Sequence, residues 1–290
     1  LLYYKLPLLE EQLKSLDVIP IYKNNNLPNR NITVKKKIKL KMANLPFYKE
    51  LHILKNLDQI KYISNIIKKY KIDIVHANNR INANILCLLA AKKCAVPYIQ
   101  HQRKFENKLS FIAKINKNYP VFYFSISNSI KDNVHEIVNA SEKKIKLIHN
   151  WINSDFAIQS NKVENNNIFK IIWIGRIVPW KGLDILIQIA KELKNNNFGS
   201  FEIDIYGDYV NLEYKEKMAQ RIKSTGLNDS IIFKGFKKFK DINVSEYSVY
   251  IHTSKTPEPF GRTIIENMLA EIPVCATSMG GVIDIINHKD

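Results

Sequence analysis

The stretch Lys255-Thr-Pro-Glu-Pro-Phe-Gly-Arg-Thr-Ile-Ile-Glu266 predicts a strand end, a loop and the start of a helix. Prolines lie on both sides of Glu258 in the loop, and we place Glu266 in the first helical turn. A helix N-terminus offers unpaired N–H groups and a positive dipole end, which suit an anion. The stretch therefore predicts a site in which two carboxylates and an amide nest hold a phosphorylated sugar.

Each carboxylate also has a purely structural interpretation. Glu258 could be an exposed loop acid. Thr263-Ile-Ile-Glu266 matches a capping box, in which the glutamate bonds a backbone N–H of its own helix. The presence of Gly261 and of the Gly280-Gly281 turn in the same region favours the functional interpretation of the two acids together.

The sequence around this stretch alternates between strand and helix patterns. The strands are expected at 169–175, 201–207, 231–235, 249–252 and 273–277, and the helices at 182–193, 212–222 and 263–271. Such alternation is typical of a parallel sheet with helices on both faces. Ligands of such sheets bind outside the carboxyl ends of the strands.

The first half of the chain repeats this alternation. We expect helices at 57–70, 83–94 and 128–138, the last capped by Ser127 or Asn128, and strands at 72–77, 95–101, 121–126 and 145–149. Residues 6–16 could form a helix, 17–22 a strand, and 34–42 either a cationic edge strand or loop or an anionic-lipid contact. Residues 152–167 lose this alternation, and the polar, turn-prone stretch 159–167 within them predicts an interdomain linker. The fold class is α/β, with two doubly wound, Rossmann-like domains, 1–157 and 158–290, facing a central cleft.

The charge of this 290-residue chain is +17, and it is unevenly distributed. Residues 1–165 contain 28 lysines and arginines against 12 acids, a net charge of +16, and residues 166–290 contain 16 against 15, a net charge of +1. The first half could therefore face an anionic membrane leaflet, a phospholipid-linked acceptor or a nucleic acid, or the lysines could be solvated surface. No segment has the roughly 18 to 20 uninterrupted apolar residues of a spanning helix, and the three cysteines, in apolar surroundings, predict buried reduced thiols.

Two cations follow the first strand of the second half. Gly175-Arg176 closes that strand and Lys181-Gly182 opens the next helix. Arginine offers a planar fork and lysine a mobile point charge, so the pair could hold a diphosphate, although both could also be solvated. Neither G-x-G-x-x-G nor G-x-x-x-x-G-K-[ST] is present, so the chain lacks the fingerprints of dinucleotide dehydrogenases and P-loop NTPases.

Two histidines of the first half, His76 and His101, are expected at strand carboxyl ends. A histidine there could donate to a sugar hydroxyl or polarise a leaving group, or it could be structural. No histidine pair has the i, i+4 spacing of a helical metal site, and there is no dense carboxylate cluster. The sequence therefore gives little support for a metal site.

An ordered series of motifs in the second half resembles the donor domain of retaining glycosyltransferases of family 4, which have the GT-B fold. The series is Gly175-Arg176, Lys181-Gly-Leu-Asp184, Tyr206-Gly-Asp208, Phe233-Lys-Gly-Phe236, Thr253-Ser254, Glu258-Pro-Phe-Gly261, Ile265-Glu-Asn-Met268, Pro273-Val274 and Gly280-Gly281. Glu258 and Glu266 have the family's E-x7-E spacing. The first half is similar more loosely, and Asn150-Trp151 stands where the family usually has Asn-Gly.

The resemblance implies a role for each candidate residue. It also implies an enzyme that needs neither a cofactor nor a metal. Catalytic roles fall on Glu258, His101, Arg176 and Lys181, with His76 as the alternative acceptor-side histidine. Arg176 and Lys181 would hold the diphosphate and stabilise the leaving group. The donor site would comprise these two cations with Gly175, the base-pocket residues Gly235 and Phe236, the sugar-binding Glu258 with the Phe260 and Gly261 amides, and the ribose-binding Glu266.

The resemblance implies a retaining glycosyltransferase that moves a sugar from a nucleotide-diphosphate sugar to a glycan or lipid-linked acceptor in surface polysaccharide or lipopolysaccharide synthesis. We expect it in the cytoplasm or on the inner face of the membrane. It also implies that the first strand with its glycine-rich loop, and the C-terminal helices, lie outside this sequence. The alternatives are a sugar-nucleotide epimerase of the same fold and a truncated, non-catalytic binding module. Nucleic-acid binding has only the charge in its favour, because no recognised module is present.

Overall fold

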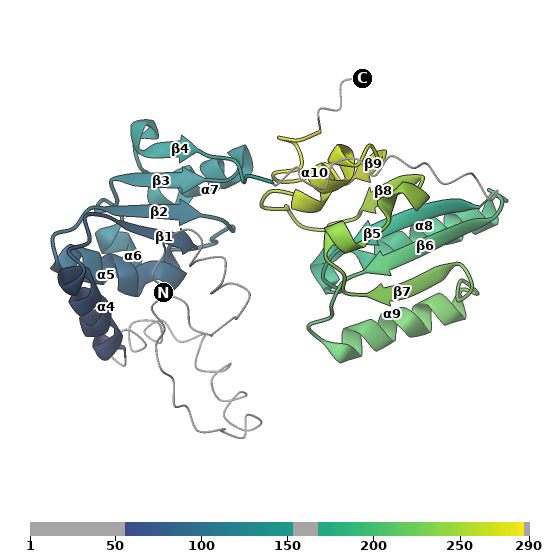
Figure 1. The fold of residues 1–290 in the computed structure, drawn as a ribbon, viewed down its shortest axis with the longest axis horizontal. Helices are drawn as coiled ribbons and strands as arrows, with labels where there is room; N and C mark the ends of the chain where they lie inside the picture. Colours follow the sequence, from purple (N-terminus) through teal and green to yellow (C-terminus); the bar gives the residue numbers. More distant parts are fainter. Residues whose placement is uncertain (1–55, 153–167, 287–290) are drawn as a thin grey trace. The chain divides into compact units, whose positions relative to one another are not determined.

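The computed structural model describes residues 56–152 and 168–286 (Figure 1). The elements expected at 6–16, 17–22 and 34–42 lie outside the described residues. So do the linker predicted at 159–167 and the boundary between 157 and 158. These parts of the domain organisation stay predictions.

The first half forms a parallel sheet of four strands in the order β1-β2-β3-β4. The strands are β1 Val75–Asn79, β2 Tyr98–Gln102, β3 Phe122–Ser125 and β4 Ile145–Leu147. The helices are α4 Leu57–Lys69, α5 Ile85–Lys93, α6 Phe111–Asn116 and α7 Asn128–Val138, with short 3-10 helices η1 Asn82–Asn84 and η2 Glu142–Lys144. The predicted alternation of helices and strands is confirmed here.

The core of this half lies on the face of the sheet that carries Tyr98 and Tyr123. Side chains alternate between the faces of a strand, and β2 is buried at every second residue. Tyr98 packs with α5, and Tyr123 packs with α6 and α7. Within residues 56–152 the packed helices lie on this face, so the second helical layer predicted for this half stays a prediction.

The second half forms a parallel sheet of five strands in the order β7-β6-β5-β8-β9. The strands are β5 Phe169–Ile174, β6 Phe201–Tyr206, β7 Ile231–Gly235, β8 Val249–His252 and β9 Val274–Ala276. The helices are α8 Leu183–Asn195, α9 Leu212–Ser224 and α10 Arg262–Leu269, with 3-10 helices η3 Pro179–Lys181, η4 Phe239–Asp241 and η5 Val244–Glu246.

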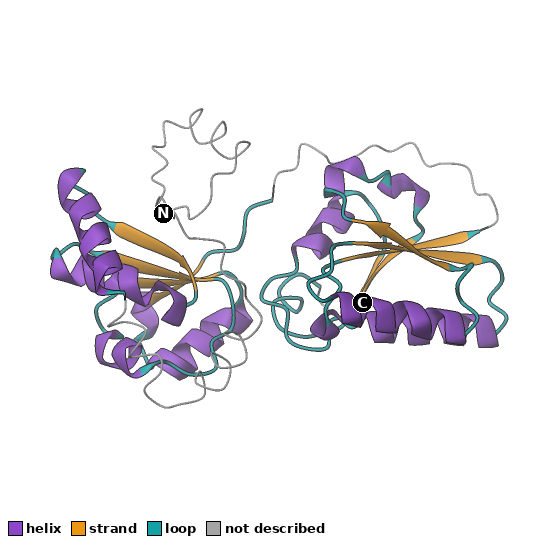
Figure 2. Ribbon diagram, turned by 90° about the horizontal axis from the view of Figure 1, so that it is seen from below, coloured by secondary structure: helices purple, strands orange, loops and turns teal. Residues whose placement is uncertain are grey.

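Helices cover both faces of this second sheet (Figure 2). Ile171 and Trp173 of β5 pack with α8 and α9, whereas Ile172, on the opposite face, packs with Ile264 of α10. Successive residues of β5 therefore pack into two different cores, one on each face of the sheet. This explains the run of consecutive apolar residues in the strand. The predicted doubly wound α/β architecture is confirmed for this half.

The strand order of the second sheet reverses between β5 and β8. The chain runs outward from β5 to β6 and β7, then returns to place β8 on the other side of β5. At such a reversal the loops leaving the two neighbouring strands diverge, and a crevice opens at their carboxyl ends. The loops after β5 and β8 are those that carry Arg176, Lys181 and Glu258.

Some predicted boundaries move in the structure. β1 begins at Val75 because Ile72 and Ile74, which were expected in the strand, are 36% and 48% exposed. Helix α6 was not predicted, although its N-cap Ser110 accepts a hydrogen bond from the Ala113 N–H in the usual way. Of the two caps predicted for α7, Ser127 or Asn128, the structure confirms Ser127, since its hydroxyl accepts from the Ile130 N–H. None of the described helices has the length and apolar character needed to cross a membrane.

Candidate functional site

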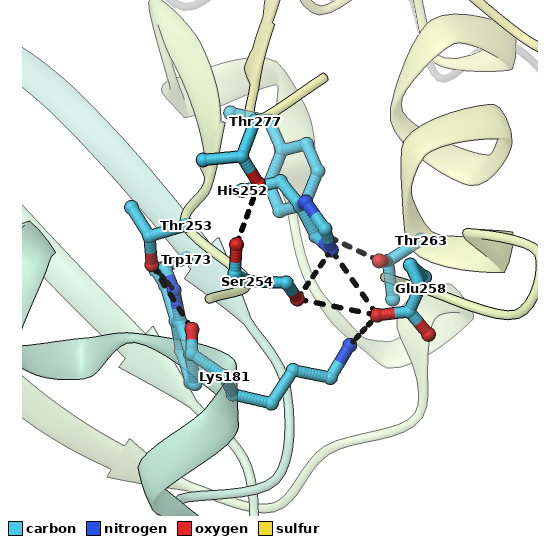
Figure 3. A network of polar contacts seen from close by, with 9 residues as sticks. Trp173, Lys181, His252, Thr253, Ser254, Glu258, Thr263 and Thr277 are labelled. Carbon is cyan, nitrogen blue, oxygen red and sulfur yellow. Dashed lines mark hydrogen bonds and ion pairs between the residues drawn. The ribbon is translucent and has the colours of Figure 1, made fainter. Parts of the chain in front are cut away.

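A buried ion pair occupies the carboxyl ends of β5 and β8. The Lys181 Nζ lies 2.5 Å from the Glu258 Oε2, and the two side chains are only 12% and 14% exposed (Figure 3). Lys181 ends η3, which follows β5, and Glu258 lies in the loop after β8. The structure thus brings together the cation predicted for the diphosphate and the carboxylate predicted for the sugar.

Two further side chains from β8 and its loop surround the same carboxylate oxygen. The Ser254 hydroxyl donates to the Glu258 Oε2 at 3.2 Å, and the His252 Nε2 lies 3.4 Å from that oxygen and 3.1 Å from the Ser254 Oγ. The buried His252 Nδ1 has no partner among the described residues. An orphaned N–H would cost more than an orphaned lone pair here, so we assign the proton to Nε2, where it points at the carboxylate.

These neighbours keep Glu258 ionised. Burial alone would raise the pKa of this carboxyl, but the hydrogen bond from His252 and the charge of Lys181 outweigh it and hold the pKa at about 2. At neutral pH the group is a carboxylate that accepts hydrogen bonds. It suits the binding of hydroxyl groups better than the donation of a proton.

A chain of hydrogen bonds ties the two loops together behind the ion pair. The Trp173 Nε1–H donates to the Thr253 Oγ1 at 3.0 Å, and the Thr253 hydroxyl donates to the Lys181 carbonyl oxygen at 3.1 Å (Figure 3). Thr277, after β9, donates to the Ser254 carbonyl oxygen at 2.9 Å. Our sequence reasoning did not identify Trp173 or His252 as site residues. The signal for both is a side chain with a ring N–H group near the carboxyl end of a largely apolar strand at the strand-order reversal.

Glycines allow the backbones of the site to approach each other. Gly182 has a φ of 71°, and a Cβ there would lie 1.8 Å from the Thr253 carbonyl oxygen. Gly280 has a φ of 69°, and its Cβ would lie 2.3 Å from the Glu258 carbonyl oxygen, which also accepts a 2.6 Å hydrogen bond from the Gly281 N–H. The Gly280-Gly281 turn singled out in the sequence is thus fixed against the backbone of Glu258.

A tryptophan links the two cations. The Arg176 guanidinium carbon lies 5.8 Å from the centroid of the Trp180 ring, and the Lys181 Nζ lies 4.7 Å from it. Both contacts are cation–π interactions. Arg176 is exposed, and no carboxylate pairs with it in the part of the chain that the structure describes. Its charge is therefore available to an anion, and Trp180 is a site residue that our sequence reasoning did not identify.

Glu266 does not lie in the first turn of its helix, where we expected it, and it does not form the capping box that was its structural alternative. Gly261, with a φ of 103°, is the N-cap, and α10 begins at Arg262, which places Glu266 beyond the first turn. The Thr263 hydroxyl bonds the Tyr250 hydroxyl at 2.7 Å, and the Glu266 Oε1 accepts from the Arg262 Nη2 at 3.2 Å. Because the left-handed Gly261 is the N-cap, the helix begins one residue before the expected start at 263. Thr263 therefore lies inside the helix and does not act as its cap. Burial raises the pKa of Glu266, and Arg262 opposes the rise.

The remaining predicted donor residues lie at or near strand ends. Gly175 follows β5, and Gly235 ends β7, where a bulge sets it opposite Tyr206. Phe236 is 63% exposed, and Phe260 is buried. The exposed ring of Phe236 is compatible with the predicted base pocket, and the roles of these residues stay predictions.

The second half of the chain is similar in sequence to known glycosyltransferases. Residues 154–290 match the family model of glycosyl transferases group 1. An uncharacterized glycosyltransferase of Methanocaldococcus jannaschii is 29% identical over 184 residues, which cover 57% of this chain and 44% of the relative. A poly(ribitol-phosphate) alpha-N-acetylglucosaminyltransferase of Staphylococcus aureus is 26% identical over 193 residues, which cover 64% of this chain and 36% of the relative. The chain therefore spans less than half the length of these two curated relatives.

Solved glycosyltransferases show the same fold. A glycosyltransferase of Rickettsia africae superposes with a TM-score of 0.75 at 25% identity, over 97% of this chain and 71% of that chain. HepE of Anabaena, solved with UDP and glucose, superposes with a TM-score of 0.71 at 18% identity, over 96% and 73%. The predicted GT-B fold is confirmed.

The two histidines of the first half lie outside the group 1 match and stack on each other. The rings of His76 and His101 are 5.4 Å apart with an interplanar angle of 13°, and both contact Phe124 edge-on. Only His101 lies near a strand carboxyl end. His76 is the second residue of β1, so its predicted position was wrong, because β1 continues to Asn79.

The chemistry of His101 is that of a neutral imidazole. Burial, with the charges of Arg103 and His76, lowers its pKa to about 4. Its buried Nε2 has no hydrogen-bond partner among the described residues. His101 could therefore exchange a hydrogen bond with a sugar hydroxyl at neutral pH, and its predicted catalytic role stays a prediction.

The predictions on cysteines and metals have different outcomes. Cys87 and Cys94 are partly buried, but Cys275 is exposed, so the expectation of three buried thiols was wrong for Cys275. Side chains alternate between the two faces of β9. The residues on either side of Cys275 are partly buried, and the Cys275 side chain therefore points outward. Within the described ranges no group of three or more His, Cys, Asp or Glu side chains could hold a metal ion. The metal independence implied by the family resemblance stays a prediction.

Proposed function

We propose that the chain is part of a retaining glycosyltransferase that moves a sugar from a nucleotide-diphosphate sugar to a glycan or lipid-linked acceptor in surface polysaccharide or lipopolysaccharide synthesis. The observation that carries this proposal is the buried Lys181–Glu258 pair beside Arg176 at the strand-order reversal. The named activity of the Staphylococcus aureus relative and the UDP and glucose bound to Anabaena HepE support a glycosyl transfer from a UDP-sugar.

In this proposal the donor lies across the loops after β5 and β8. Arg176 and Lys181 hold the diphosphate, and Trp180 fixes both cations by cation–π contact. Glu258 accepts hydrogen bonds from hydroxyls of the transferred sugar, and its ion pair with Lys181 couples the sugar and diphosphate positions. Glu266 binds the ribose, and Phe236 lines the base pocket.

Catalysis then rests on charge neutralisation of the leaving group. As the bond from the sugar to the diphosphate breaks, negative charge grows on the diphosphate, and preorganised cations stabilise it without reorganisation. The acceptor oxygen attacks from the same face and passes its proton to the departing phosphate, which retains the configuration. One Glu258 oxygen is already engaged by lysine, serine and histidine. This favours a binding role over that of a covalent nucleophile.

The donor prediction is tested by a thermal-shift panel of UDP-, GDP- and ADP-sugars on the full chain, with and without EDTA. At 100 times the dissociation constant the matching donor should stabilise the protein by about 2.7 kcal/mol. EDTA should leave the shift unchanged, because Arg176 and Lys181 supply the positive charge. Absence of a shift with every donor would contradict the donor site.

Product analysis separates transfer from the alternatives. Incubation with the stabilising donor and no acceptor should leave the sugar isomer unchanged. A new sugar isomer would identify an epimerase instead. Donor binding without turnover on any glycan or lipid-linked acceptor would identify a binding module.

We also propose that the basic first half meets the anionic inner face of a membrane, where a lipid-linked acceptor would lie. Residues 1–165 have a net charge of +16, and each lysine or arginine near an anionic surface contributes about 1 kcal/mol. We expect co-sedimentation with vesicles that contain phosphatidylglycerol, and its loss at high salt. Equal binding to purely phosphatidylcholine vesicles, or no binding to either, would contradict this.

A further inference from the structure

Arg103 is the first residue after β2, at the carboxyl edge of the first sheet. Its backbone N–H donates to the Asn79 carbonyl oxygen at 3.0 Å, which ties it to the end of the neighbouring strand β1. The ends of β1 and β2 therefore set the direction in which the side chain leaves the sheet.

Neutral groups hold the Arg103 guanidinium. The Nη1 lies 3.5 Å from the Asn78 Oδ1, and the Nη2 donates to the Asn150 Oδ1. Asn78 belongs to β1, and Asn150 follows β4, so three segments of the first half meet at this side chain. A guanidinium has five N–H groups in a fixed fork. Amide oxygens can orient two of them, but they do not cancel the positive charge.

The charge of Arg103 has no counterion among the described residues. Several cations of the second half differ in this respect, since each lies close to a carboxylate: Lys181, Lys234, Lys255 and Arg262. Arg103 is partly buried and held in place, yet unpaired. A fixed, uncompensated guanidinium is the geometry that recognises a carboxylate or phosphate through two parallel hydrogen bonds.

Two unsatisfied polar atoms lie in the same part of the sheet. The Asn79 Oδ1 and the His101 Nε2 are buried without a hydrogen-bond partner in the described residues. Asn79 also has a φ of 134°, a strained value for a residue with a side chain. Buried polar groups are usually satisfied, and backbone strain concentrates at functional sites. Both observations are accounted for if a polar ligand completes this edge.

We propose that Arg103 is the anion-binding residue of an acceptor subsite, with Asn78 and Asn150 as its positioning residues. The acceptor is therefore an anionic glycan or lipid-linked sugar that carries a phosphoryl or carboxylate group near the hydroxyl to be glycosylated. This rests on the proposed transferase function for the word acceptor, but the anion site itself is independent of it.

The test measures binding of small probes by ligand-observed NMR to the full chain at low salt. The probes are glycerol 3-phosphate against glycerol, and glucuronate against glucose. We expect the wild type to bind at least one anion and neither neutral partner. Arg103→Gln should weaken anion binding by about tenfold or more, and Arg103→Lys should weaken it less, because an ammonium keeps the charge but loses the fork. Preference for the phosphate or the carboxylate probe identifies the group that the acceptor carries.

Matched variants make the test specific. Arg80→Gln removes an exposed charge near the same edge and should not change anion binding by more than a factor of about two. Arg176→Gln removes the exposed charge on the donor side and reports any part of the anion binding that belongs to the donor site. Equal weakening by Arg80→Gln and Arg103→Gln would indicate diffuse charge, and weakening by Arg176→Gln without weakening by Arg103→Gln would place the anion on the donor side. Either outcome overturns the proposal, as does unchanged binding in Arg103→Gln or no anion binding by the wild type.

The proposed transferase function is tested separately, by titration of the protein with UDP. Arg103-dependent anion binding with no UDP binding would uphold the anion site and remove the donor site. UDP binding together with anion binding that does not depend on Arg103 would uphold the donor site and remove the anion site. Circular dichroism of Arg103→Gln should match the wild type, and Asn150→Ala gives a second variant that leaves Arg103 intact but loosens its fork, with a smaller loss of affinity.

Discussion

Replacing Arg176 and Lys181 together by alanine is expected to abolish sugar transfer. In the proposed mechanism each cation stabilises charge that grows on the leaving diphosphate, and the loss of one such preorganised group costs about 100-fold or more in rate. The measurement is turnover of the donor that gives the largest thermal shift. Lys255→Ala is the matched control, because Lys255 pairs with Asp184 and does not contact Glu258.

The single variants Arg176→Ala and Lys181→Ala should differ in their stability against unfolding. Arg176 is exposed and has no carboxylate partner in the described part of the chain, so Arg176→Ala should unfold like the wild type. Lys181→Ala leaves the buried Glu258 without its cation and should be clearly less stable. Turnover of the double variant at the wild-type rate would refute the assignment of the donor site.

The second large effect is expected for Glu258→Gln. The amide keeps the shape of the side chain but leaves Lys181 as a buried charge without a counterion, which costs about 3 kcal/mol of unfolding free energy. Transfer should fall as well, because the hydroxyl-binding carboxylate is gone. Urea denaturation and turnover measure the two effects. Adding Lys181→Met should restore part of the stability but none of the activity. A Glu258→Gln variant as stable as the wild type would contradict the buried pair.

The same carboxylate predicts how stability depends on pH. Its pKa is about 2 in the folded protein against 4.5 for a free glutamate, so folding favours the ionised form. Its contribution to stability is complete above pH 4.5 and is lost as the pH falls towards 2. The stability gap between the wild type and Glu258→Gln should therefore shrink between pH 5 and pH 2. A gap that stays constant over this range would contradict the depressed pKa.

Local patterns predicted the elements of the fold well. Helix α7 and strands β7 and β8 have the bounds expected from the sequence, because apolar periodicity and turn residues act over a few neighbours. The site loops were also placed correctly at strand ends, since glycine and proline mark such turns.

Contacts between distant segments could not be predicted in this way. The approach of Lys181 to Glu258 depends on β5 and β8 becoming neighbours, which a local pattern does not encode. The capping box failed because the left-handed Gly261 started the helix ahead of Thr263. His76 was misplaced because β1 continues through two asparagines, residues that are depleted in strands.

The reversal of strand order also sets the moment at which the proposed donor site can form during synthesis. β5, β6 and β7 leave the ribosome in sequence and can pair in that order, but β8 must return to the far side of β5. Such a long-range pairing forms slowly, after loop closure has been overcome. A nascent chain that has not yet added β8 has Lys181 but no Glu258 beside it. The growing polypeptide is therefore expected to acquire its affinity for nucleotide sugar only once the second sheet is complete.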